Sequence, residues 1–167
     1  VALLFAQPPS RSKVRVLASR AHFHLAADEA EEAAQAAREA LEMADALGLD
    51  DFRAHSLSTL GFSRVMTGDL DGLHDLRESV EVGALANSPQ VARGYNNLAS
   101  ITADLGDLET AFDLYAKSRH AAARFGDELA LRWLEVERMY EHYRRGHWDR
   151  ALAVGEAVLD TVGEAPE

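Results

Sequence analysis

The sequence predicts an all-α protein, an αα-superhelix (solenoid) of about four antiparallel helix pairs. The first observation is a repeated turn signal: Gly68-Asp69-Leu70 recurs 38 residues later as Gly106-Asp107-Leu108. The second is another series of breaks between these signals, at Leu47-Gly48, Ala86-Asn87 and Phe125-Gly126, spaced 39 residues apart. Apolar residues between the breaks recur at steps of three and four, which is the period of a helix. Two interleaved series with nearly the same period indicate two helices per repeat.

Eight helices are expected. Their predicted pairs are 11–27 with 29–47, 51–67 with 70–86, 89–105 with 108–125, and 128–145 with 148–162. Short connections between helices make neighbours antiparallel. The repeat domain then covers residues 11–162, with repeats at about 11–48, 49–87, 88–126 and 127–162. We interpret residues 1–10 as the stub of a preceding helix with a linker, and residues 163–167 as a frayed tail.

The helical period is clearest in the first helix of the third and fourth pairs. In the third pair the apolar stripe steps by four, three, four and three through Val91, Tyr95, Leu98, Thr102 and Leu105. It returns 38 residues later as Leu129, Trp133, Val136, Tyr140 and Tyr143. Such a stripe is the buried face of an amphipathic helix. This pattern favours a place in the core for Trp133.

The breaks carry the residues that end and begin helices. Glycine closes many of the predicted helices, because it tolerates the left-handed conformation after the last turn. Asp69, Asp107 and Asp127 are each placed to accept hydrogen bonds from the free amides of the next helix. Pro8-Pro9-Ser10 is typical of a break followed by a helix start.

The third repeat resembles the tetratricopeptide repeat at its informative positions. These are Tyr95-Asn96-Asn97-Leu98-Ala99, Gly106-Asp107-Leu108, Ala111 and Tyr115. Small residues such as Ala99 and Ala111 let two helices approach closely. The other repeats match less completely; the second has Leu73 where a small residue is expected. The period exceeds the usual length of about 34 residues, and is similar to the long-helix arrays of bacterial signal-transduction ATPase regulators and actinobacterial cyclase-linked regulators.

Composition and charge exclude several classes of function. The net charge of −11 argues against binding a phosphate backbone, so no direct nucleic-acid binding is expected. The absence of cysteine removes disulfides and thiolate chemistry, and fits a reducing cytoplasm. No apolar run approaches the roughly 20 residues that span a bilayer, so no membrane partner is expected. The preference for arginine over lysine and the many alanines suggest a GC-rich bacterial genome.

No catalytic, metal or cofactor site is expected. His22 and His24 point to different faces of a helix, and His142 and His147 flank a turn. We interpret most histidines as exposed helix positions. Paired carboxylates such as Glu31-Glu32 show no sign of the distinct environments that acid–base catalysis requires. The chain is therefore predicted not to be an enzyme.

The first helix of each pair is the expected binding surface, since it usually lines the concave side of a helical-repeat stack. The resemblance to tetratricopeptide repeats implies that polar residues there can hold a peptide. In the third repeat those residues are Arg93, Asn96, Asn97, Ser100 and Asp104. Asn97 corresponds to an asparagine that bonds a peptide backbone or carboxylate in several family members. Phe62 and Trp133 are weaker candidates for the same surface, since either can be a core residue.

The sequence therefore favours a non-catalytic protein- or peptide-binding scaffold, the sensor or docking part of a larger bacterial cytoplasmic regulator. The alternative is a structural spacer or self-association module without a ligand groove. Leu3, Leu4 and Phe5 would leave an open apolar end, which can support a homodimer through the amino-terminal repeat.

Overall fold

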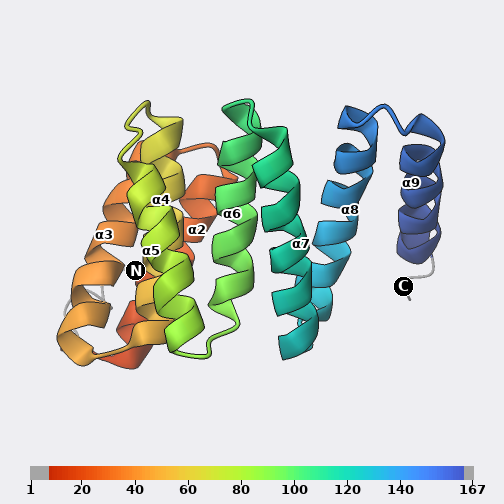
Figure 1. Ribbon diagram of the computed structural model, residues 1–167. Coiled ribbons are helices and arrows are strands. Elements are labelled where there is room, and N and C mark those ends of the chain that lie inside the picture. Colours follow the sequence, from red (N-terminus) through yellow and green to blue (C-terminus); the bar gives the residue numbers. More distant parts are fainter. Residues whose placement is uncertain (1–7, 164–167) are drawn as a thin grey trace.

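The computed structural model describes residues 8–163, with side chains described as far as residue 160. This part of the chain forms eight α-helices and no strand (Figure 1). The helices are α2 (Arg11–Ala26), α3 (Ala30–Leu47), α4 (Asp50–Met66), α5 (Gly72–Leu85), α6 (Gln90–Asp104), α7 (Leu108–Phe125), α8 (Glu128–Arg144) and α9 (Trp148–Gly163). The all-α helical-repeat class predicted from the sequence is confirmed. The predictions for residues 1–5, including the amino-terminal dimer, and for the tail after Gly163 concern residues outside this range.

Every connection between two described helices contains one residue in the left-handed conformation. Five of the seven positions are glycines, and the other two are Asp28 (φ 63°) and Asn87 (φ 49°). A left-handed residue after the last turn lets the final carbonyls find partners, and glycine adopts it without steric cost. In the first connection, where the sequence offers no glycine, Asp28 takes this conformation itself.

Three helix starts have the side-chain caps that the sequence indicates. Ser10 accepts from the Lys13 amide, Asp107 from the Thr110 amide and Asp127 from the Ala130 amide. Asp69 does not cap the next helix, contrary to prediction, because α5 begins at Gly72 and not at residue 70. Its carboxylate instead accepts from the Asp71 amide and from Arg64.

Small residues set the closest helix contacts. Ala99 and Ala111 are both fully buried in the third pair, as predicted. In the second pair Gly61 and Gly72 play this part, since a Cβ on Gly61 would lie 2.5 Å from the Gly72 carbonyl oxygen. The small residue that the repeat pattern requires is therefore Gly72, and Leu73 next to it is only partly buried.

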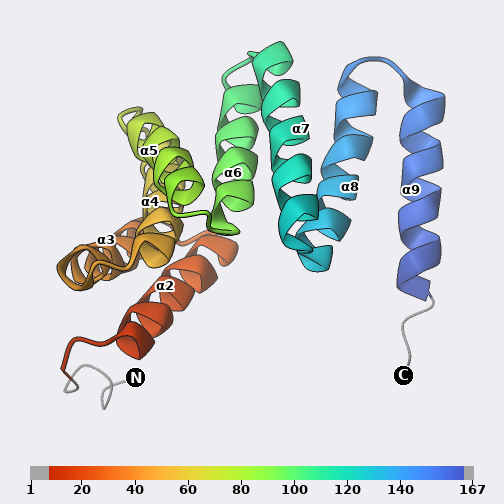
Figure 2. The same ribbon diagram turned by 60° about the horizontal axis from the view of Figure 1, so that its bottom comes forward.

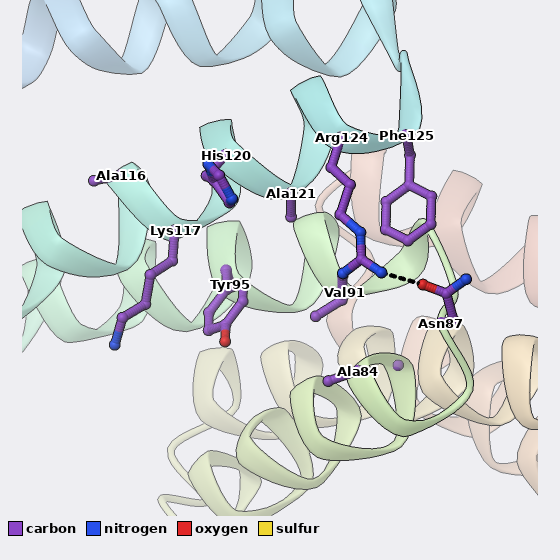
Figure 3. A pocket seen from close by; sticks show the side chains of 11 residues that line it. Ala84, Asn87, Val91, Tyr95, Ala116, Lys117, His120, Ala121, Arg124 and Phe125 are labelled. Atoms are coloured by element: carbon purple, nitrogen blue, oxygen red, sulfur yellow. Dashed lines mark hydrogen bonds between the residues drawn. The ribbon is translucent and has the colours of Figure 1, made fainter.

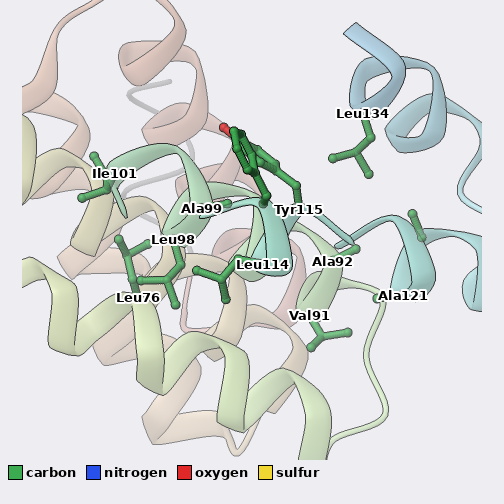
Figure 4. Close-up of a cluster of buried hydrophobic side chains, with 12 residues drawn as sticks. Leu76, Val91, Ala92, Leu98, Ala99, Ile101, Leu114, Tyr115, Ala121 and Leu134 are labelled. Atoms are coloured by element: carbon green, nitrogen blue, oxygen red, sulfur yellow. The ribbon is translucent and has the colours of Figure 1, made fainter. Parts of the chain in front are cut away.

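The hydrophobic core is unevenly distributed along the stack. Its largest cluster joins α5, α6, α7 and α8 and contains the side chains drawn in Figure 4. Two smaller clusters are formed between α2, α3 and α4. They rely on alanine, because α3 buries Ala33, Ala34, Ala36, Ala37, Ala40 and Ala44. Side chains this small allow close packing but bury little apolar area for each residue.

The first helices of the first three pairs lie on the inner side of the stack. α4 contacts both α2 and α6, whereas the second helices α3, α5 and α7 make no extensive contact with one another. In a curved stack, the helices on the inside lie closer to one another than the helices on the outside. Therefore α2, α4 and α6 form the concave side. Figure 2 shows the carboxyl end of α2 beside the amino end of α6.

The helix α8 is rotated about its axis relative to the predicted register. Leu134 is its one fully buried side chain, at 2% exposure. The stripe that was predicted to be buried is largely in solvent: Leu129 is 80% exposed, Trp133 60% and Tyr140 51%. The core placement of Trp133 was therefore wrong. α8 follows the contacts of Leu134 with the core of the third pair rather than the repeat pattern.

Candidate functional site

Polar side chains from the three inner helices meet where the first three pairs adjoin. We call this group the polar junction: His22 of α2, His55, Ser58 and Thr59 of α4, and Arg93 and Asn97 of α6. The junction brings together two of the residues predicted from the sequence, Arg93 and Asn97. The other four were not predicted to belong to a site.

Arg93 is the centre of the polar junction. One guanidinium nitrogen, Nη2, lies 2.9 Å from His22 Nδ1 and 3.4 Å from Thr59 Oγ1. Arginine can only donate, so His22 Nδ1 must accept, and the imidazole is neutral with its proton on Nε2. Burial, followed by the charge of Arg93, lowers the pKa of His22, which agrees with the neutral form of the imidazole.

The environment of Arg93 is unusual because its hydrogen-bond partners are neutral. Burial lowers the pKa of its guanidinium to about 10, still high enough to keep the charge at neutral pH. No carboxylate of residues 8–160 forms an ion pair with Arg93, and its buried Nε has no hydrogen-bond partner among them. A partly desolvated cation without an anion is costly, and a carboxylate from another molecule would offset that cost.

His55 adds a second neutral imidazole to the junction. Its Nε2 is buried and has no hydrogen-bond partner within the described part of the chain. Burial lowers the pKa of His55 to about 3, with smaller contributions from Arg93 and His22. His55 is an exception to the prediction that most histidines are exposed, because α4 is enclosed by α2, α3, α5 and α6.

The two asparagines of α6 behave differently. Asn97 Nδ2 donates to Ser58 Oγ at 3.0 Å and so joins the third repeat to the second. Asn96 is partly buried, and its Oδ1 lacks a hydrogen-bond partner among the described residues. That oxygen is itself buried, whereas the Oδ1 of Asn97 is neither buried nor bonded to a described residue, so Asn97 has the acceptor that a ligand can reach.

Ser100 and Asp104 belong to a separate group further along α6. Ser100 and Glu137 of α8 lie close enough to the Tyr115 hydroxyl of α7 to influence its pKa. Burial raises the pKa of Tyr115 to about 12 and also raises the pKa of Glu137. Asp104 is exposed, and its Oδ1 lies 4.0 Å from Nη2 of Arg144 in α8. These two predicted residues therefore connect α6 with α7 and α8.

The two aromatic candidates lie apart from the polar junction. Phe62 is partly buried and packs on the main core cluster, which makes it a packing residue. Trp133 is exposed on α8. The sequence signal that could have revealed the junction is the run of small polar residues in α4, Ser56, Ser58, Thr59 and Ser63, all buried. In a helix with neighbours on every side, such residues mark contacts with other polar groups.

Among the described side chains, no three His, Asp or Glu residues are grouped so that they could hold a metal ion. No helix in residues 8–163 is long and apolar enough to cross a lipid bilayer.

Comparison with known proteins supports the fold alone. No model of a known protein family matches the sequence, and no curated protein is similar to it. Among solved structures, the chain is similar to the crystal structure of BtubC (BKLC) from P. vanneervenii, with a TM-score of 0.69 and 22% sequence identity. The match covers 93% of this chain but 63% of BtubC, so the chain spans less than two thirds of that protein's length.

Proposed function

We propose that the chain is a non-catalytic scaffold that binds a protein or peptide at the concave side of its helical stack. The observation that carries the proposal is Arg93, a partly buried guanidinium whose partners, His22 and Thr59, are neutral. The contact between Arg93 and His22 lies at the surface, where a second molecule can reach it. A carboxylate from a peptide would pair with this cation and replace its weaker contacts.

Neighbouring groups fit the rest of a peptide. His22 carries its proton on Nε2 and can donate, while the Oδ1 of Asn97, whose amide nitrogen bonds Ser58, can accept from a backbone amide. One cation, one donor and one acceptor are the groups that recognise a carboxylate and the amide next to it. The resemblance to tetratricopeptide repeats supports the same use of this surface.

The proposal is tested with peptides selected on the purified chain from a random octapeptide library and then measured in solution. We expect selected peptides to carry a carboxylate whose replacement by an amide weakens binding about tenfold or more. Arg93→Met should weaken binding equally, whereas Arg38→Met, which removes an exposed arginine from α3, should not. Binding should also shift the imidazole NMR signals of His22. The proposal would be refuted if the selected peptides had the same affinity for the Arg93→Met variant as for the parent chain.

The wider role we propose is the sensor or docking part of a larger bacterial cytoplasmic regulator. Its support is the similarity of the repeat length and punctuation to the arrays attached to such regulators. In this role, occupancy of the polar junction would change how the inner helices meet, and a domain attached to the stack would respond.

A structural or self-association module is the alternative, and exposed apolar side chains on α8 and α9 favour it. They include Leu129, Trp133, Tyr140, Tyr143, Trp148, Leu152 and Leu159. Apolar surface of this extent often marks an interaction site. Sedimentation equilibrium distinguishes the two functions: self-association that Trp133→Ser and Trp148→Ser abolish, together with no peptide selected at Arg93, would favour the alternative.

A further inference from the structure

A cleft of about 430 Å³ lies on the outer side of the stack, away from the polar junction. Its floor is α6, with Val91 and Tyr95, and its walls are α5 and α7 (Figure 3). The cleft exists because α5 and α7 make no extensive contact, and because the α5 wall is formed by Gly83 and Ala84, which have almost no side-chain bulk.

The α7 wall of the cleft is basic. Lys117, His120 and Arg124 lie at spacings of three and four residues, which places them on one face of the helix. No acidic residue lines the cleft, although the chain as a whole carries a net charge of −11. This local reversal of charge is what an anionic ligand would recognise.

These basic groups are not neutralised by the protein. No carboxylate in the described part of the chain pairs with Lys117, His120 or Arg124, and all three are exposed. Arg124 donates to Asn87 Oδ1 at 2.5 Å, and its guanidinium lies 5.2 Å from the centre of the Phe125 ring. Both partners are neutral, so they fix the position of the guanidinium at one end of the cleft while its charge stays available.

The spacing of the basic groups suits an extended peptide. Lys117 and Arg124 are seven residues apart, or about 10 Å along the helix axis. Alternate side chains of an extended chain point the same way and are about 7 Å apart. Two acidic residues separated by one position would face α7 together, and the flexible side chains of Lys117 and Arg124 can make up the difference of about 3 Å. The residue between them would face the small side chains of α5.

We propose that the α5–α7 cleft binds an extended acidic peptide segment with carboxylates at alternate positions and an apolar residue between them. The carboxylates contact Lys117, His120 and Arg124, and the apolar side chain fills the space beside Gly83, Ala84 and Tyr95. The site is independent of the polar junction on the concave side.

The test uses a fluorescein-labelled peptide, Gly-Ser-Glu-Leu-Glu-Leu-Glu-Ser, and its control with glutamine in place of each glutamate. Fluorescence anisotropy at low salt should show binding of the glutamate peptide alone, weakened by added salt. The double variant Lys117→Gln/Arg124→Gln should reduce affinity about tenfold or more. Ala84→Glu, which puts a carboxylate into the cleft from an exposed position, should have a similar effect.

Two controls make the result specific. Arg38→Gln removes the same charge from α3 and should leave the affinity unchanged. An excess of a peptide selected at the concave site should also leave it unchanged, so that failure of the proposed concave site and failure of this one can be told apart. The proposal is overturned if the glutamine peptide binds equally well, or if the double variant keeps the parent affinity. It is also overturned if pyrophosphate binds at Lys117 and Arg124 while neither peptide does.

Discussion

Gly61 and Gly72 face each other across the contact between α4 and α5, each at a place where a methyl group would overlap the other's carbonyl oxygen. The added Cβ would meet backbone atoms in both cases, and these cannot move aside as a flexible side chain can. The two glycines therefore set the distance between the helices of the second pair.

We expect Gly61→Ala to lower the free energy of unfolding by about 2 kcal/mol, because overpacking against backbone outweighs the gain in helix propensity. Urea unfolding monitored by circular dichroism measures the change. Gly155→Ala in α9 is the matched control, since its Cβ would meet only the sulfur of Met139, at 3.2 Å. That control should be neutral or slightly stabilising. Equal effects of the two substitutions would contradict the close contact at Gly61.

His55 makes the stability of the chain depend on pH. Its folded pKa of about 3 lies below the ordinary value of 6.5, so between these values the unfolded chain binds a proton that the folded chain does not. Stability is therefore lost as the pH falls through 6.5. We expect the titration of His55 to lower the free energy of unfolding by about 2 kcal/mol between pH 7 and pH 5. His22, whose pKa is also lowered, acts in the same direction.

The measurement for His55 is urea unfolding at both pH values for the parent chain and for His55→Gln. The variant should lose less stability on acidification, because the group that titrates is gone. A loss as large as that of the parent would show that His55 is not held neutral by burial. His74→Gln serves as the matched control for the loss of a histidine, since His74 is exposed on α5.

The rotated register of α8 separates the effects of two adjacent residues. Leu134→Ala should cost about 2–5 kcal/mol of stability, because Leu134 is buried in the core cluster. Trp133→Ser should change stability by less than about 0.5 kcal/mol, since most of that side chain is in solvent. Thermal unfolding of the two variants decides between the registers. A larger loss for Trp133→Ser would restore the register that the repeat pattern predicts.

The fold could be predicted because its signals are local. These signals involve residues within one or two helical turns of each other. They are the apolar period of three and four, the left-handed residue in each connection, and the caps at Asp107 and Asp127. Asp28 and Asn87 show that the connection demands a backbone conformation, which residues other than glycine can also adopt. The register of α8 could not be predicted this way, because both of its faces carry apolar residues and tertiary contacts select between them.

The candidate site was only partly predictable for a different reason. Arg93 and Asn97 were found from their place in the third repeat. Their partners Ser58 and Thr59 belong to the second repeat, and His22 belongs to the first. Contacts between helices far apart in the sequence depend on how the stack curves. The local pattern of a repeat does not determine that curvature. The basic face of the α5–α7 cleft was missed because Lys117, His120 and Arg124 share one side only once the helix forms. Along the sequence, Ser118, Arg119 and three alanines stand between them.

The bond between Arg93 and His22 joins residues 71 positions apart, in the first and third helix pairs. A simple solenoid has contacts only between adjacent repeats, and can lose its repeats one at a time. Here the first three pairs are tied directly to one another and should melt as one cooperative unit. Among the side chains described as far as residue 160, the pair α8–α9 has no such tie to a distant repeat, and Leu134 is the one fully buried side chain of α8. Hydrogen exchange should therefore be fastest in that pair, which opens while the rest of the stack remains folded.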